Sequence, residues 1–292
     1  MPVLVASLIP QRPEYPWQSV LNGLTLTGMT VVPVSRLGRD DVLVIWNRYG
    51  HQAQCAGRHP GRVLVMENGY TPPLVRCGVV EKFYALGFDG LQSKSRFLAR
   101  GVERWASFGF KTKSWQRKLS GHILVCGQRG GAYSETSMPY EWPAKICKLL
   151  LAGRARQILY RPHPERPNIG VNLPDGVTVV DPSRPLATHL ADAYACVVWG
   201  SNSVVEAVMM GVPSEAFGPG HILQDVLIQP KDRYDSSGYD PSGPICYDVQ
   251  SILLRDRLPA FERLAWGQWT EAELKTGSPF KRLLDAEAGG RC

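Results

Sequence analysis

The sequence predicts an α/β protein with two similar-sized halves, each built around a parallel β-sheet. Short apolar runs alternate with longer amphipathic segments, as strands and crossover helices do in parallel sheets. The alternation stops in a polar, basic stretch at residues 111–121 and then begins again, which is typical of a linker between domains. We therefore place a first domain at residues 1–115 and a second at residues 116–292.

The first half contains four apolar runs of strand length and two segments long enough for helices between them. The predicted strands are Val3–Ile9, Thr30–Val34, Val42–Trp46 and Arg62–Met66. The predicted helices are Trp17–Leu26 and Gln52–His59.

The second half repeats this pattern. The predicted strands are residues 122–127, 157–164 and 177–181 and the run before Gly200, and the predicted helices are Trp142–Leu151, Pro185–Ala193 and a segment from about Val204 to Met210. Residues 232–244 are rich in Gly, Ser, Asp and Pro, which indicates a loop. Thr270 and Glu273 have the spacing of a capping box, so we expect a terminal helix from Glu271.

Composition bounds the possible functions. With 292 residues and 44% hydrophobic content, the chain can bury a core, and it has no apolar run long enough to span a membrane. No secretory leader is expected, and the seven cysteines have no paired spacing, so we expect a cytoplasmic protein with reduced thiols. The net charge of +7 favours a polyanionic partner, although a merely soluble basic enzyme fits equally well.

Small polar residues follow the predicted strand that ends before Gly200. Ser201, Asn202 and Ser203 lie where a helix should begin, so they fit either a helix cap or an anion site. Glu206 is placed to close a capping box with Ser203 or to bind a ribose hydroxyl.

Two further motifs follow predicted strands. In the first, Arg161 can bind a phosphate through two N–H groups and His163 can donate to one, although a loop histidine is more often simply exposed. In the second, Gly127, Arg129 and Gly130 allow backbone N–H groups to approach a ligand. This glycine spacing matches neither a dinucleotide-binding motif nor a P-loop, and an ordinary turn is the alternative.

These motifs together resemble the second domain of GT-B glycosyltransferases, in particular the capsule-polysaccharide, Kdo and sialic-acid transferases. The resemblance covers about residues 120–220 and implies two Rossmann-like domains that face a cleft. It also implies that His163 and Arg161 meet the phosphates of a nucleotide-sugar donor, that residues 201–203 bind the phosphate or sugar, and that Glu206 binds the ribose. Asn202 interrupts the serine pair of the family motif, so the donor nucleotide, which we expect to be UDP, is not fixed.

The first half is similar to bacteriophage proteins suspected of modifying viral DNA. The similar segments are residues 41–54, residues 61–70 and the terminal LAWGQWTEAEL. This implies 5-hydroxymethylpyrimidine in DNA as the acceptor. The predicted DNA-binding residues are Arg48, Tyr49, Tyr70 and Arg96, within a wider set of basic and aromatic residues that includes Arg58, Lys94, Arg100, Tyr84 and Phe97. Core aromatics beside a solvated basic face are an equally good interpretation.

Transfer to a hydroxyl needs a base, and the departing phosphate needs charge stabilisation. Glu67 is the first candidate for the base, with His51 and Asp89 as alternatives, because each follows a strand-like run. No D-x-D motif occurs, so we expect no metal and no cofactor beyond the nucleotide sugar. We thus predict a metal-independent hexosyltransferase acting on phage DNA. A capsule-type or lipopolysaccharide-type glycan transferase, a UDP-sugar epimerase-like enzyme and a non-catalytic DNA-binding module remain as alternatives.

Overall fold

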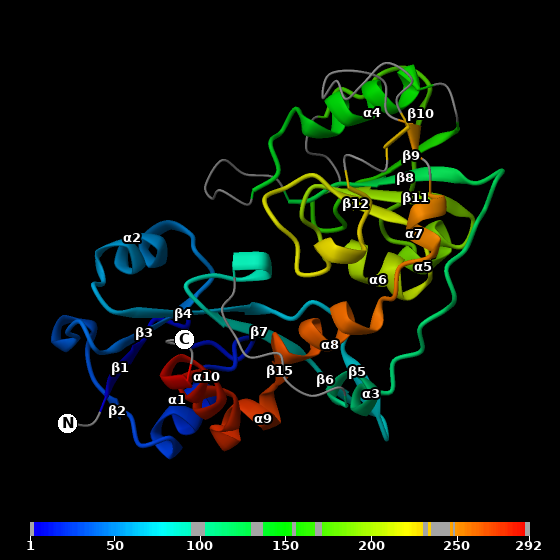
Figure 1. Cartoon of the computed structure of the whole chain (residues 1–292). Helices are drawn as coiled ribbons and strands as arrows, with labels where there is room; N and C mark the ends of the chain where they lie inside the picture. Colours follow the sequence, from blue (N-terminus) through cyan, green and yellow to red (C-terminus); the bar gives the residue numbers. More distant parts are fainter. Residues whose placement is uncertain are drawn as a thin grey trace. The chain divides into compact units, whose positions relative to one another are not determined.

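The computed structural model describes residues 3–94, 103–129, 137–153, 156–166, 171–229, 233–234, 246–247 and 249–289. The chain forms two compact units (Figure 1), one of Met1–Gly109 with Phe261–Cys292 and the other of Phe110–Ala260. Each has a sheet with parallel strands and covering helices, which confirms the α/β class. The predicted division differs at the end of the chain, because residues 261–292 pack with the first unit.

The first unit contains a six-stranded sheet in the order β15-β7-β4-β3-β1-β2. Its strands are β1 (Leu4–Ser7), β2 (Thr30–Val31), β3 (Val42–Trp46), β4 (Arg62–Asn68), β7 (Phe83–Phe88) and β15 (Gln268–Thr270). The first four are mutually parallel, as predicted, whereas β7 pairs antiparallel with both β4 and β15. The carboxyl end of β7 therefore lies at the opposite edge of the sheet from the carboxyl end of β4.

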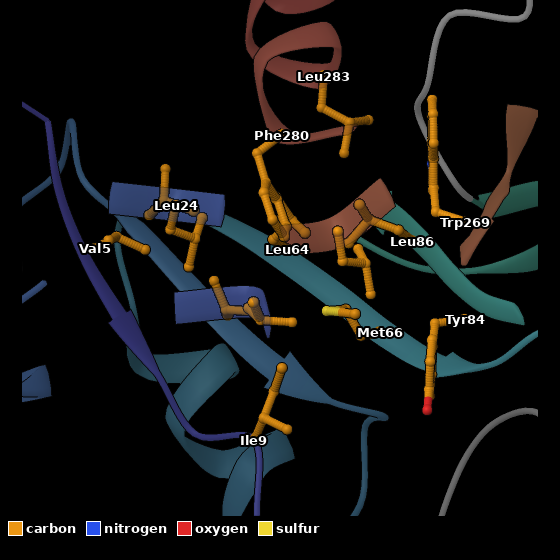
Figure 2. Close-up of a cluster of buried hydrophobic side chains, with 14 of the residues drawn as sticks. Val5, Ile9, Leu24, Leu64, Met66, Tyr84, Leu86, Trp269, Phe280 and Leu283 are labelled. Atoms are coloured by element: carbon orange, nitrogen blue, oxygen red, sulfur yellow. The ribbon is translucent and has the colours of Figure 1, made fainter. Parts of the chain in front are cut away.

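Helices cover both faces of this sheet. The predicted helix α1 (Trp17–Leu26) is confirmed, and with α9 (Glu271–Thr276) and α10 (Ser278–Gly289) it covers one face. Phe280 and Leu283 of α10 meet Leu24 and Leu64 in the core there (Figure 2). The other face is covered by α2 (Gly50–Arg58), which packs Cys55 and Ala56 against it.

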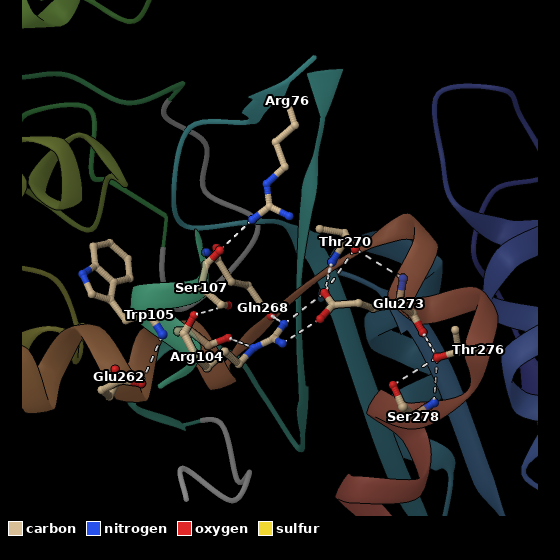
Figure 3. A network of polar contacts seen from close by, with 11 residues as sticks. Arg76, Arg104, Trp105, Ser107, Glu262, Gln268, Thr270, Glu273, Thr276 and Ser278 are labelled. Carbon is tan, nitrogen blue, oxygen red and sulfur yellow. Dashed lines mark hydrogen bonds and ion pairs between the residues drawn. The ribbon is translucent and has the colours of Figure 1, made fainter. Parts of the chain in front are cut away.

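The terminal segment is joined to the first unit by Arg104 of α3 (Arg104–Phe108). Its guanidinium binds both carboxylate oxygens of Glu273, at 2.6 and 3.0 Å (Figure 3). The guanidinium carbon lies 4.0 Å from the ring centre of Trp269. The guanidinium also donates to the carbonyl oxygens of Ala265 and Gln268. The predicted capping box between Thr270 and Glu273 is confirmed, and α9 begins at Glu271. Arg104 therefore holds β15 and the start of α9 together.

Two smaller elements complete the first unit. A hairpin of β5 (Leu74–Arg76) and β6 (Val79–Glu81) forms its own small sheet, and Arg76 ties it to the carbonyl oxygen of Ser107. The helix α8 (Leu258–Trp266) carries the chain back into this unit, and its Glu262 accepts from the N–H of Trp105.

The second unit contains a wholly parallel sheet in the order β10-β9-β8-β11-β12. The strands are β8 (His122–Cys126), β9 (Ile158–Arg161), β10 (Val177–Val179), β11 (Ala193–Val198) and β12 (Ser214–Ala216). Every residue of β11 is buried, which accounts for its continuous apolar sequence.

The helices of the second unit lie close to their predicted positions. They are α4 (Trp142–Ala152), α5 (Leu186–Leu190) and α6 (Ser203–Met209). A further short helix, α7 (Gln250–Leu253), was not predicted. Of the predicted loop at residues 232–244 only Arg233–Tyr234 are described, and they form strand β13 against β14 (Cys246–Tyr247). Within the described parts of the chain, no helix is long and apolar enough to cross a membrane.

Candidate functional site

The carboxyl ends of three parallel strands meet at one edge of the second unit's sheet. Cys126, the last residue of β8, is in register with Arg161 of β9 and with Val198 of β11. The segments that follow, residues 127–129, 162–166 and 199–203, therefore emerge side by side. In parallel α/β sheets this edge is where ligands bind, and all three predicted donor motifs lie here.

Two hydrogen bonds join these segments. The N–H of Gly127 donates to the carbonyl oxygen of Arg161 at 2.8 Å, and the N–H of Gly200 donates to Oε1 of Gln128 at 3.0 Å. A Cβ atom at Gly127 would lie 2.5 Å from Tyr160 Oη, whereas a Cβ at Gly200 would meet nothing within 4 Å. Gly127 is thus required by packing, and Gly200 faces open space. The sequence had not singled out Gln128, whose role depends on strand register.

His163 is held in one tautomer when it is neutral. Its Nδ1 accepts from the N–H of Glu165 at 3.2 Å, so the ring proton resides on Nε2. Burial lowers the pKa of His163 below its usual value, and the positive charge of Arg129 lowers this pKa further. The imidazole is therefore neutral at pH 7, and Nε2–H remains as a donor for a ligand.

The two arginines of the edge have different surroundings. Arg129 is exposed and forms an ion pair with Glu165. Arg161 donates through Nη2 to the carbonyl oxygens of Pro182 and Arg184, at 2.8 and 3.0 Å. Both forked faces of a guanidinium include Nη2, so the bidentate phosphate contact predicted for Arg161 is not available in this arrangement. Arg161 instead fixes the loop that follows β10.

Ser201 and Ser203, at the start of α6, bond to each other. Ser201 Oγ accepts from the N–H of Ser203 at 3.2 Å and lies 2.8 Å from Ser203 Oγ. Asn202 is the residue before the helix, and its side chain makes no capping bond. All three are partly exposed. Ser201 therefore forms a local turn, and the two hydroxyls remain at the edge as a bonded pair.

Glu206 lies one turn into α6 and is partly buried. Burial raises the pKa of its carboxyl group, and the charge of Arg161 acts in the opposite direction. The predicted capping box between Ser203 and Glu206 is not present, because Asn202, and not Ser203, is the residue that precedes the helix. The predicted contact of Glu206 with a ribose stays a prediction.

In the first unit, the structure separates the three candidate bases. Glu67 lies within β4, exposed, and alternation places it on the sheet face that α2 covers. His51 lies in the first turn of α2, 3.5 Å from Cys55 Sγ, at the same edge of the sheet. Asp89 follows β7, and its N–H bonds to Val63 near the start of β4. Since β7 is antiparallel to β4, Asp89 lies at the other edge, and its assignment as a base stays a prediction.

The predicted acceptor residues also separate. Arg48 and Tyr49 are exposed after β3. Tyr70 is 3% exposed, and its hydroxyl accepts from the N–H of Gln92, so its ring cannot stack on an extruded base. Tyr84 is likewise in the core. Four residues named from the sequence lie outside the described ones: Arg96, Phe97, Arg100 and Gly130.

Comparison with known proteins supports the predicted fold. No protein-family model matches the chain, and no curated protein matches it by sequence. Among solved structures, the beta Kdo 2,7 transferase of Thermosulfurimonas dismutans KpsC is 13% identical, with a TM-score of 0.50 over 96% of this chain and 99% of that chain. The beta Kdo 2,4 transferase of the same protein is 14% identical, with a TM-score of 0.56 over 98% of each chain. At these identities the likeness shows a shared fold.

Proposed function

We propose that this chain is a glycosyltransferase whose second unit binds a nucleotide-sugar donor. The observation that carries the proposal is the edge at β8, β9 and β11, where the segment with His163 and the segment with Gly200, Ser201 and Ser203 follow strands of one parallel sheet. The Nε2–H group of His163 and the serine hydroxyls are neutral hydrogen-bond donors of the kind that stabilise negative charge developing on a phosphate. The fold shared with two Kdo transferases supports the same assignment.

In the proposed reaction an acceptor hydroxyl attacks the anomeric carbon of the donor. The bond between that carbon and the phosphate oxygen breaks, and the phosphate leaves with the electron pair. His163 donates a hydrogen bond to the departing phosphate, and Arg129 supplies positive charge. A base takes the hydroxyl proton, and Glu67, His51 and Asp89 stay predicted candidates for it. Two predictions about this reaction are untested: that it needs no metal ion, and that the nucleotide of the donor is UDP.

We propose a carbohydrate hydroxyl as the acceptor. The two solved structures of similar fold are both named as Kdo transferases, whereas the burial of Tyr70 removes one support for stacking on a flipped DNA base. Acceptance of hydroxymethylated DNA was predicted from charge and a resemblance, and we retain it as an arm of the test.

The test is a transfer assay with a panel of nucleotide sugars and two acceptor sets. One set contains oligosaccharides and the other contains 5-hydroxymethylpyrimidine DNA, and products are identified by mass. A sugar-sized gain on an oligosaccharide supports the proposal, and a gain on the DNA base moves the acceptor to DNA. Isomerised donor without transfer would identify an epimerase. Binding of DNA with steep salt dependence but no nucleotide binding would identify a DNA-binding module.

A further inference from the structure

An acidic side chain lies among the basic groups of the proposed donor site. Glu165 pairs with Arg129 across the segments that follow β9 and β8, and their side chains are 63% and 60% exposed respectively. The backbone N–H of Glu165 also bonds to Nδ1 of His163. The carboxylate of Glu165 is thus paired with the guanidinium of Arg129, close to His163, at the edge where the donor phosphate should bind.

We propose that Glu165 is a resident counter-ion that an incoming phosphate displaces from Arg129. This rests on the proposed function. An ion pair this exposed contributes little to stability, so breaking it costs little. A phosphate offers Arg129 short, charge-assisted bonds, and it can use the forked geometry that a carboxylate uses.

The two arginines have different parts in this exchange. The Nη2 group of Arg161 is held by two carbonyl oxygens, so its position is fixed by the fold. Arg129 is held by a side chain that can rotate away. Glu165 therefore reduces the positive charge of the empty site, and its removal should strengthen the binding of anions.

The experiment compares the wild type with Glu165→Gln in calorimetric titrations with inorganic pyrophosphate and with UDP. The amide keeps the size of the side chain and the backbone bond to His163 but removes the competing charge. We expect about three- to tenfold tighter binding and a steeper loss of affinity with added salt, because the site gains net positive charge. Unchanged or weaker binding would overturn the proposal.

Two controls isolate the counter-ion effect. Asp192→Asn breaks the exposed ion pair between Asp192, which precedes β11, and Lys118, which precedes β8. This substitution should leave anion affinity unchanged. In an Arg129→Gln background, Glu165→Gln should produce a smaller gain than in the wild type, because the guanidinium that it frees is missing. An equal gain in both backgrounds would contradict displacement from Arg129.

The outcomes also separate this inference from the function on which it rests. If the wild type binds neither pyrophosphate nor any nucleotide, both the donor site and the counter-ion are refuted. If the wild type binds them and Glu165→Gln binds no more tightly, only the counter-ion is refuted. Thermal unfolding of each variant checks that the fold is intact.

Discussion

The two units differ in how exposed the polar groups are at the carboxyl ends of their parallel strands. In the second unit, Gln128 bonds to Gly200, Gly127 bonds to Arg161, and Glu165 bonds to His163. In the first unit, Glu67 and His51 are exposed, one on a strand and the other in the first turn of a helix. The first arrangement suits a fixed ligand such as a phosphate, whereas the second suits groups that act on varied acceptors.

The largest expected effect is on kcat, and it should distinguish Glu67 from Asp89, the carboxylates at the two edges of the first sheet. If Glu67 is the base, Glu67→Gln should lower kcat by about 10²–10⁴-fold, because the acceptor hydroxyl then keeps its proton in the transition state. Asp89→Asn, at the opposite edge, should change kcat by less than about twofold. Steady-state kinetics with the sugar acceptor measure both. Normal turnover by Glu67→Gln would mean that Glu67 is not the base. His51 would then be the candidate, and His51→Ala is the corresponding test.

A similar test applies to the fixed edge of the second unit. His163→Ala should lower kcat by about 10²–10³-fold, because the leaving phosphate loses a preorganised donor. His163→Asn, which keeps an N–H group, should retain more activity than the alanine variant. If alanine at this position transfers sugar at the wild-type rate, His163 is an ordinary loop histidine and the donor assignment fails.

The contacts of Arg104 that attach the terminal segment should contribute to the free energy of unfolding. Arg104→Ala should lower the free energy of unfolding by about 3 kcal/mol, because it breaks a partly buried bidentate pair. Burial alone would raise the pKa of Glu273, but the bonds and charge of Arg104, together with the bonds from Thr270, outweigh burial and hold the pKa below its usual value of 4.5. The pair therefore stabilises the fold fully above pH 4.5 and less as the pH falls through the lowered pKa.

Chemical denaturation of the wild type and Arg104→Ala at pH 7 and at pH 3.5 measures this difference. The gap between the two proteins should narrow at the lower pH. A gap that stays constant would mean that Arg104 acts through its stacking on Trp269 rather than through the carboxylate.

The smallest effect should distinguish the two glycines at the edge of the second unit. Gly127→Ala should destabilise the protein by about 1–3 kcal/mol, since the new Cβ collides with Tyr160 Oη. Gly200→Ala should leave stability almost unchanged but weaken nucleotide binding, because its Cβ enters the open space where we place the donor. Thermal unfolding and titration with UDP separate the two effects, and equal behaviour of the two variants would contradict the proposed position of the donor.

Local patterns predicted the parts of the molecule that depend on neighbouring residues. Helix α1 and the capping box at Thr270 follow from spacing within one or two turns, and the donor motifs follow directly from apolar strands. The reversal at β7 could not be predicted in this way, because it depends on how β7 pairs with β4 and β15. The burial of Tyr70 likewise depends on Gln268, whose side chain accepts from the N–H of Tyr70 at 2.8 Å across 198 positions.

Prediction of the candidate site also succeeded for local motifs and failed for contacts that depend on strand register. His163 and residues 200–203 were recognisable because each motif carries its own chemistry. Gln128 and Glu165 were not recognised, since a glutamine and a glutamate after a strand are ordinary loop residues until the strand register brings them to their partners. The carbonyl groups that bond to Nη2 of Arg161 could not be predicted either, because such contacts leave no mark in the sequence.

The return of residues 261–292 to the first unit has a consequence for the order of folding during synthesis. The second unit is one continuous segment and is complete once residue 260 has left the ribosome. Most of the first unit precedes the second, yet β7 lacks its partner β15, and α1 lacks α9 and α10, until these three elements emerge. The exposed core of the first unit must therefore wait while another unit folds, so a ribosome-associated chaperone should matter more to residues 1–109 than to residues 110–260.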